Sequence, residues 1–206
     1  MSVLDSIKQD VLKSIKNDPA HDFDHIMRVY LNAQKILENE NASKKLVLSA
    51  VLLHDIVSYP KSDKRSVNAS IESAKKAKTI LKKYDFTDDE IIIVYNAICD
   101  HSFSQRKIPH TMEGKILQDA DRLDALGAIG IARVFATGGS LKRSFYNTND
   151  PFCSKRIPDD KTWTVDHFFA KLFKLEILMN TKTGKIEAKK RTKILRTFLK
   201  QLQSEI

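Results

Sequence analysis

The sequence predicts an all-α fold organised as a single domain over residues 1–206. Apolar residues recur every three or four positions along most of the chain, the spacing that places them on one face of a helix. Only 6 Gly and 5 Pro interrupt it, and no internal repeat or low-complexity linker divides it. With 42% hydrophobic and 30% charged residues, the composition excludes collagen-like, disordered and disulfide-scaffold proteins.

Three helical stripes occupy the N-terminal part of the chain. Apolar residues spaced over 4–15 predict a first helix that ends at 17–19, because Pro19 disfavours helical geometry in the residue before it. A second stripe covers 23–37. A third, over 46–57, is apolar on nearly every side, which indicates a helix at the centre of the core that ends before Pro60.

Two further helices are predicted in the middle of the chain. Small and apolar residues over 67–84 predict a helix that can approach a neighbour closely. Thr87 and Glu90 then form the pattern of a capping box, which opens the next helix. The run 91–95 has strand propensity, but the cap and the helical spacing of its apolar residues favour a helix.

The C-terminal part is predicted to contain three helices and one long loop. The sixth helix covers 113–136, and Gly138 and Gly139 are expected to stop it. An irregular loop follows over 140–161; its length, aromatic residues and cations suit a lid over bound base and phosphate. The last two helices are expected at 165–179 and 194–202.

The charge balance indicates the class of partner. Lys and Arg number 35 against 26 Asp and Glu, a formal net charge of +9, which favours nucleotides, other phosphorylated metabolites or nucleic acid. Many of the cations lie after Ala170 and are spaced as a solvated helix face. Nucleic acid is the less favoured partner, because the chain offers no recognition helix and no basic stretch interleaved with aromatic residues. A homo-oligomer stays open.

We expect a cytoplasmic protein without a membrane partner. The apolar stretch at 46–53 is far shorter than the roughly 20 residues that span a bilayer. The N-terminus lacks the charged start and apolar block of a signal peptide. Cys99 and Cys153 fit a compartment in which thiols stay reduced, and their separation gives no metal-finger spacing.

Histidines and aspartates at three places are candidate metal ligands. His25 lies in the second stripe, His54 and Asp55 directly follow an apolar block where they are costly to bury unpaired, and Asp121 belongs to an acidic cluster. Each alone has an ordinary structural or surface explanation. Together they offer two nitrogens and two oxygens and leave octahedral positions for water and substrate. This set suits Mn²⁺, Fe²⁺ or Mg²⁺ better than a structural Zn²⁺.

Four ordered blocks of sequence resemble the HD-domain metal-dependent phosphohydrolases. The blocks are His21-Asp22-Phe23-Asp24-His25, Leu52-Leu53-His54-Asp55, His101-Ser102-Phe103-Ser104 and Asp119-Ala120-Asp121-Arg122-Leu123-Asp124. The resemblance spans about residues 20–205. Beyond the four blocks, the segments 129–133 and 167–172 look like the subgroup of small stand-alone members, which includes nucleotide pyrophosphatases. The resemblance implies an all-helical HD-domain bundle and metal ligation by His25, His54, Asp55 and Asp121.

The chain departs from this family after the His-Asp pair. Many members carry a second acid there, whereas this chain has Ser58 and Lys61, so a mechanism assisted by an acid at that point is not expected. Lys61 is a candidate phosphate contact, with a plain surface lysine as the alternative. His101 is a candidate catalytic residue, phosphate contact or ligand, or else a histidine favoured by a helix C-terminus. Ligation by both His101 and His110 would match the binuclear branch.

The sequence therefore predicts a phosphohydrolase with one divalent ion, Mn²⁺ in first place and Mg²⁺, Fe²⁺ or Co²⁺ as alternatives. Asp124 is the candidate to orient or deprotonate the attacking water. Arg28, Lys61 and Arg122 are candidates to neutralise substrate phosphates. The expected substrate is a nucleotide, cleaved at an α,β anhydride or at a terminal phosphate ester. The alternatives are a non-catalytic ligand sensor and a nucleic-acid-binding helical domain.

Overall fold

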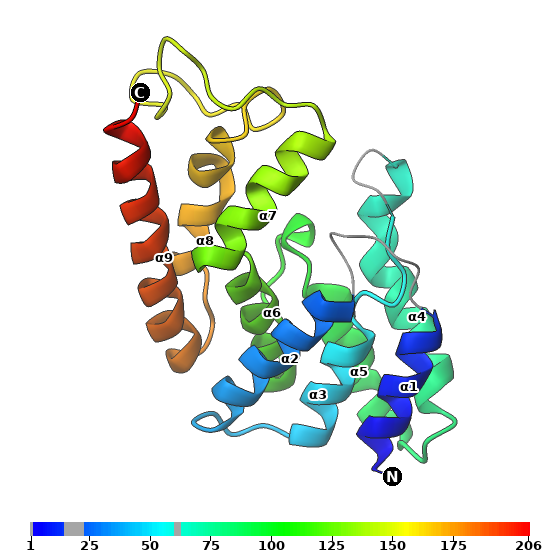
Figure 1. Ribbon diagram of the computed structural model, residues 1–206. Helices are drawn as coiled ribbons and strands as arrows, with labels where there is room; N and C mark the ends of the chain where they lie inside the picture. The colour runs from blue at the N-terminus through cyan, green and yellow to red at the C-terminus, as the bar shows by residue number, and fades with distance from the viewer. Residues whose placement is uncertain (1, 15–22, 60–62) are drawn as a thin grey trace. The chain divides into compact units, whose positions relative to one another are not determined.

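The computed structural model describes residues 2–14, 23–59 and 63–206 (Figure 1). Its contacts divide the chain into two compact units, Met1–Asp121 and Arg122–Ile206, and each is described by itself. Within the described residues the backbone is helical apart from turns, loops and one isolated bridge between Ser144 and Trp163. The all-α prediction is confirmed. None of the described helices is long and apolar enough to cross a membrane.

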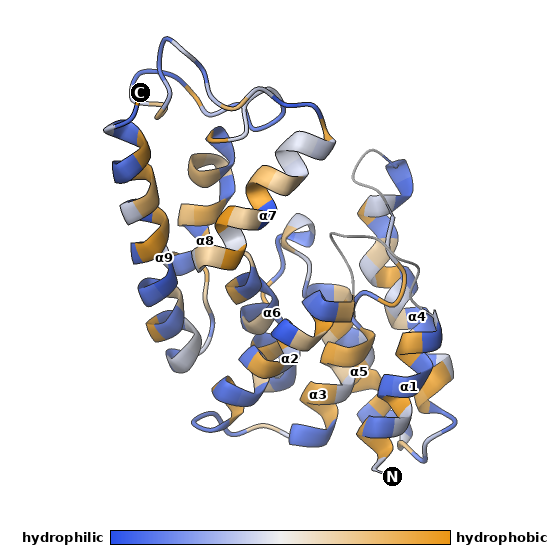
Figure 2. Cartoon of the chain, viewed as in Figure 1, coloured by the Kyte–Doolittle hydropathy of each residue, from blue (hydrophilic) through white to orange (hydrophobic). Residues whose placement is uncertain are grey.

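The first unit is built around one buried helix. Its helices are α1 (Val3–Ser14), α2 (Phe23–Leu37), α3 (Lys44–Leu53), α4 (Ala69–Leu81), α5 (Asp88–Asp100) and the beginning of α6 (Met112–Asp124). Helix α3 contacts α1, α2, α4 and α5, and each of its residues from Leu46 to Leu53 is buried. The apolar colouring of α3 in Figure 2 agrees with this central place, which the sequence predicted.

The capping box of α5 forms as predicted. The Thr87 hydroxyl accepts a hydrogen bond from the Glu90 N–H, and the Glu90 carboxylate accepts one from the Thr87 N–H. Lys45 of α3 also donates to both carboxylate oxygens of Glu90 at 2.9 Å. The β-branched run that follows is helical, because the cap fixes the helix start and the apolar stripe of α5 packs on α3 and α4.

Two helix boundaries near the His-Asp pair differ from the prediction. Helix α3 ends at Leu53 instead of residue 57, and His54 is its C-cap, so Asp55 lies in the following turn. Helix α4 begins at Ala69 because a short 3₁₀ helix, Lys64–Asn68, precedes it. Because of these two boundaries, the polar side chains of His54 and Asp55 lie at the end of α3, and those of Ser66 and Ser70 lie at or just before the start of α4.

The prediction of one helix over 113–136 is wrong. Helix α6 ends at Asp124, and α7 (Gly127–Ser140) begins at a glycine with φ of +71°, a conformation that other residues adopt only with strain. Nor does Gly138 stop α7. A Cβ atom there would lie 2.3 Å from Thr164 Oγ1, so this glycine permits close approach of two segments.

The second unit packs α7 and a short helical pair against α9. A π-helical turn, Phe168–Leu172, leads into α8 (Phe173–Ile177), where a helix over 165–179 was predicted. Helix α9 (Lys182–Gln203) begins three turns before the predicted 194. Its early buried positions are Gly184, Ala188 and Thr192, small or polar residues that a count of large apolar residues overlooks. The exposed lysines between them give the mixed colouring of α9 in Figure 2.

The irregular segment after α7 is held by charged contacts within the second unit. Arg156 donates to both carboxylate oxygens of the buried Asp166, and its guanidinium lies 4.5 Å from the centre of the Trp163 ring. Asp150 accepts hydrogen bonds from the N–H groups of Ser154 and Lys155. That this segment acts as a lid stays a prediction.

Candidate metal centre

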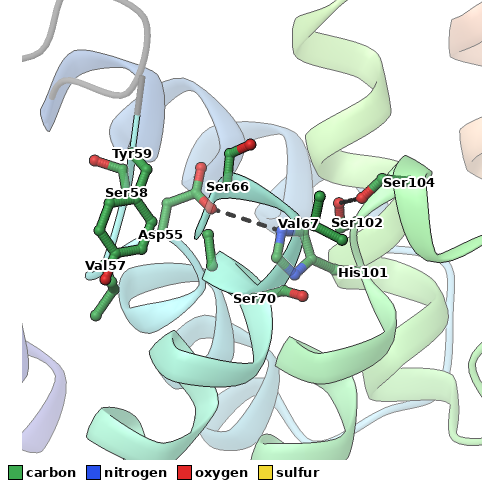
Figure 3. A pocket seen from close by; sticks show the side chains of 11 residues that line it. Asp55, Val57, Ser58, Tyr59, Ser66, Val67, Ser70, His101, Ser102 and Ser104 are labelled. Carbon is green, nitrogen blue, oxygen red and sulfur yellow. Dashed lines mark hydrogen bonds and ion pairs between the residues drawn. The ribbon is translucent and has the colours of Figure 1, made fainter. Parts of the chain in front are cut away.

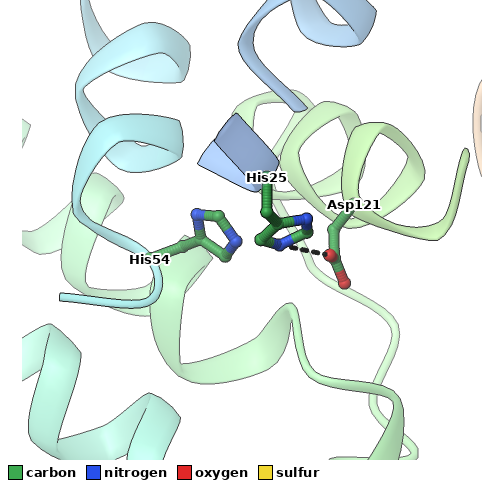
Figure 4. Close-up of side chains that lie close together, drawn as sticks. All are labelled: His25, His54 and Asp121. Atoms are coloured by element: carbon green, nitrogen blue, oxygen red, sulfur yellow. Dashed lines mark ion pairs between the residues drawn. The ribbon is translucent and has the colours of Figure 1, made fainter. Parts of the chain in front are cut away.

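Five side chains from four helices of the first unit gather at one place. His25 is near the start of α2, His54 and Asp55 follow α3, His101 is the C-cap of α5, and Asp121 is on α6. His25 Nε2 lies 3.5 Å from Asp121 Oδ1 and 3.7 Å from Asp55 Oδ2. Asp55 Oδ2 lies 3.6 Å from His54 Nε2, and its Oδ1 lies 3.7 Å from His101 Nε2. Figure 4 shows His25 between His54 and Asp121.

These side chains form two overlapping groups of ligand atoms. His25, His54 and Asp121 make one group, and His54, Asp55 and His101 make the other; within each, the ligand atoms all lie within 4.8 Å of one another. Two ligands on opposite sides of an ion at the usual distances lie about 4 Å apart. The structure therefore brings together the four side chains that the sequence nominated as ligands, with His101, a candidate catalytic residue or ligand, beside them.

Backbone hydrogen bonds orient two of the imidazoles. His54 Nδ1 lies 2.7 Å from the Val51 carbonyl, and His101 Nδ1 lies 2.6 Å from the Ile98 carbonyl. Because a carbonyl can only accept, each Nδ1 must carry the hydrogen, and in the neutral ring Nε2 is left with its lone pair. A hydrogen bond of this kind commonly orients a metal-binding histidine.

The chemistry of this donor set fits a divalent cation. His54 Nε2 is buried and has no hydrogen-bond partner, which is costly unless something else satisfies its lone pair. Burial lowers the pKa of His54, so its ring is neutral, the state that binds a metal. Burial also opposes charge on His101, but the interaction with Asp55 outweighs it and raises the pKa of His101. A cation held by His25, His54, Asp55 and Asp121 would offset both carboxylates and occupy that lone pair.

Three buried polar side chains that sequence reasoning missed hold the ligand-bearing segments. The Asn32 amide donates to the Ala120 carbonyl and ties α2 to α6. The Ser73 hydroxyl bonds both the N–H and the carbonyl of Val57, just after the His-Asp pair. The Gln118 amide donates to the carbonyls of Asp100 and Lys107, on either side of His101. Their only signal in the sequence is a polar residue within a largely apolar stripe.

Two recesses adjoin the cluster, and Asp55 lines both. One is a cavity of about 270 Å³ that His101 and several serines also line, shown in Figure 3. The other, of about 250 Å³, is lined by Asp55, Ser14 and Lys76 among others. A substrate therefore has access to the carboxylate from two sides.

The remaining candidates lie as follows. Arg28 is half-buried on α2, one turn after His25. Lys61 lies outside the described residues. Within the second unit, the Arg122 guanidinium donates to the Leu178 carbonyl, and the buried Asp124 carboxylate accepts a 2.5 Å hydrogen bond from Arg133. The catalytic and substrate roles of these residues stay predictions.

Comparison with known proteins agrees with the site. The model of the HD domain family matches residues 22–126. The Bacillus subtilis protein YpgQ is 32% identical over 201 residues, 95% of this chain and 90% of its own. Its crystal structure in complex with ADP gives a TM-score of 0.75 and covers 98% of this chain and 97% of that one. An HD-superfamily hydrolase of Bacillus thuringiensis gives 0.77 at 32% identity, with 98% and 95% covered.

The matched segment contains every residue of the cluster, from His25 at its start to Asp121 near its end. HD domains bind divalent metals, and the orphaned His54 Nε2 beside two carboxylates is suited to one. On its sequence, fold and donor set, the chain belongs to the HD domain family and is related to HD-superfamily hydrolases.

Proposed function

We propose that this protein is a phosphohydrolase that uses one divalent cation to hydrolyse a nucleotide. The observation that carries the proposal is the buried His54 Nε2, which has no hydrogen-bond partner and faces Asp55. A core histidine with a purely structural role would have both ring nitrogens satisfied. A nitrogen left with its lone pair beside carboxylates is suited to a cation, and a mixed set of imidazole and carboxylate ligands suits Mn²⁺ first, with Mg²⁺, Fe²⁺ and Co²⁺ as alternatives.

Two observations support a nucleotide as the substrate. The relative YpgQ has been crystallised in complex with ADP. The net charge of +9 favours an anionic ligand in general. The bond cleaved is either an α,β anhydride or a terminal phosphate ester, and the identity of the released phosphate distinguishes them. The proposed compartment is the cytoplasm.

The residues of the cluster divide the work. His25, His54, Asp55 and Asp121 bind the cation, which supplies Lewis acidity for polarising a phosphoryl oxygen and a water. The carbonyls of Val51 and Ile98 fix the rings of His54 and His101. His101 Nε2 lies 3.7 Å from Asp55 Oδ1, so a protonated His101 ring can donate a hydrogen bond to a phosphoryl oxygen bound at the cluster. Arg28, Lys61 and Arg122 are proposed phosphate contacts, and Asp124 is proposed to orient the water.

The test is hydrolysis of a panel of nucleoside triphosphates, diphosphates and monophosphates by metal-stripped protein resupplied with each ion. Release of pyrophosphate from a triphosphate would identify cleavage of the α,β anhydride, and release of phosphate from a monophosphate would identify cleavage of the ester. Asp121→Ala is expected to abolish turnover and leave the circular dichroism unchanged. Asp89→Ala, which removes an exposed carboxylate from α5, is the matched control and should turn over as wild type does. Wild-type turnover in Asp121→Ala would refute the role of Asp121 as a metal ligand. If the wild type hydrolyses no nucleotide with any of the four ions, a non-catalytic ligand sensor is favoured instead.

A further inference from the structure

The cavity beside the cluster has an unusual lining. Of the side chains around it, five are serines and Asp55 is the one carboxylate among the described lining residues. The serines are Ser58, Ser66, Ser70, Ser102 and Ser104. A hydroxyl both donates and accepts hydrogen bonds, so this wall can pair with a ligand group that does the same. Figure 3 shows Ser66, Ser70 and Ser102 around His101.

Ser70 is the one of these serines whose hydroxyl is both buried and without a hydrogen-bond partner. Ser70 is only 5% exposed, and its Oγ makes no hydrogen bond. A serine on a helix commonly donates to the carbonyl four residues earlier, but Ser70 near the start of α4 does not. Leaving a buried hydroxyl unpaired is costly, and the cost is recovered when a ligand in the cavity supplies the partner. Ser102 and Ser104, by contrast, bond each other at 2.9 Å.

The charges around the cavity disfavour a phosphate inside it. No lysine or arginine appears among the described residues that line it, so neither kind of side chain can neutralise a phosphate there. The second recess differs, because Lys76 lines it together with Asp55. Since Asp55 belongs to both walls and to the cluster, a substrate bound at the cluster can direct a neutral part to the serines and a charged part toward Lys76.

The size of the cavity limits which ligands can fit inside it. At about 270 Å³ it is below the range of about 300–1,000 Å³ that holds a drug-sized ligand. A sugar ring is small enough for such a volume, whereas a complete nucleotide would extend beyond it. We propose that this cavity, which we call the serine pocket, binds the sugar of the nucleotide, and that Ser70 Oγ determines specificity by hydrogen bonding to it. The proposal rests on the proposed function for the identity of the substrate.

The test separates sugar binding from phosphate chemistry. Ser70→Ala and Ser66→Ala remove hydroxyls from the serine pocket, and Ser49→Ala is the matched control, because Ser49 Oγ is also buried and unpartnered but lies within α3 and outside the pocket. For each protein we would measure KM for a nucleoside triphosphate and for inorganic tripolyphosphate. Calorimetric titration of metal-free protein with adenosine, which carries no phosphate, gives a second readout.

Ser70→Ala is expected to raise the KM for nucleotide and the Kd for adenosine about threefold to tenfold, the equivalent of one hydrogen bond. Its KM for tripolyphosphate should stay within about twofold of wild type, and its melting temperature should not fall, because an unsatisfied hydroxyl has been removed. Ser66→Ala should show a smaller rise, and Ser49→Ala none.

Unchanged adenosine binding in Ser70→Ala, or no adenosine binding by wild type, would overturn the proposal even if the enzyme hydrolyses tripolyphosphate. An equal rise in KM for tripolyphosphate would overturn it as well, because the serine would then act on the phosphates. If wild type hydrolyses nothing, the proposed function fails, and the adenosine titration still decides whether the serine pocket binds a sugar.

Discussion

Asp121→Asn is expected to change the stability of the protein in opposite directions with and without metal. Asp55 and Asp121 each approach His25 Nε2, at 3.7 and 3.5 Å, so one imidazole separates the two carboxylates. Their oxygens lie at most about 7 Å apart, where two like charges repel by about 2 kcal/mol at an effective dielectric constant near 20. The Asp121 side chain is 27% exposed, and screening reduces this to about 1 kcal/mol.

In the absence of metal, the amide removes this repulsion and keeps the shape of the side chain. We therefore expect Asp121→Asn in EDTA at pH 8 to melt at the wild-type temperature or up to about 4 °C above it. With Mn²⁺ at a hundred times the wild-type Kd, linkage stabilises the wild type by about 2.7 kcal/mol, or about 5–11 °C. If the amide weakens binding about a hundredfold, the same Mn²⁺ concentration stabilises the variant by only about 0.4 kcal/mol.

Scanning calorimetry of both proteins, with the Kd for Mn²⁺ taken from titration of the wild type, provides the measurement. Asp89→Asn serves as the control and should show the same rise in melting temperature with Mn²⁺ as the wild type, because its carboxylate is exposed on α5 and lies outside the cluster. The reasoning is refuted if Asp121→Asn lowers the melting temperature equally in EDTA and in Mn²⁺, since Asp121 would then be a structural acid. A wild-type melting temperature that does not respond to any divalent ion would refute the cation site itself.

Two further predictions address the frame of the site and the loop of the second unit. Gln118→Leu leaves the carbonyls of Asp100 and Lys107 without their amide donor and should cost about 2 kcal/mol, about 4–8 °C in melting temperature; a change below 1 °C would show that this clamp is dispensable. Burial, together with the charge of Asp166, raises the pKa of Cys153 to about 11, so in Cys99→Ser its alkylation by iodoacetamide should speed up about tenfold per pH unit from 8 to 10. A rate plateau near pH 9 would contradict that pKa.

The helices that the sequence predicted best have strong local signals. Helix α3 has an apolar run broken only by Ser49, and α5 has the capping box of Thr87 and Glu90. The break between α6 and α7 was missed because only the backbone geometry at Gly127 reveals it, whereas the apolar spacing continues across it. The first three turns of α9 were missed because their buried residues are small or polar, so the sequence has no stripe of large apolar residues there. Local propensity thus fails where tertiary packing decides.

The candidate site shows the same division. The sequence nominated His25, His54, Asp55 and Asp121 as ligands because their ordered blocks resemble the HD-domain family, whereas each residue alone has an ordinary structural explanation. It did not nominate Ser70, since a serine in a helix of small residues is unremarkable until its burial and hydrogen bonding are known. A residue that matters because its buried polar atom lacks a hydrogen-bond partner can be identified only from the three-dimensional structure.

A missing partner indicates a ligand only where a ligand can reach it. Ser49 Oγ is as poorly satisfied as Ser70 Oγ, but Ser49 is fully buried within α3 among apolar side chains and lines neither recess beside Asp55. The unpaired Ser49 hydroxyl therefore lowers the stability of the protein whether or not a ligand is bound. For His54 and Ser70 a bound ligand can remove the cost of the unpaired atom. His54 faces the carboxylate of Asp55, and Ser70 faces a cavity that Asp55 also lines. An unpaired polar atom destabilises the protein when no ligand is bound, and a ligand that pairs with it removes this cost and is held in place by the new contact. The unpaired atoms of His54 and Ser70 are therefore better explained by ligand binding than by imperfect packing.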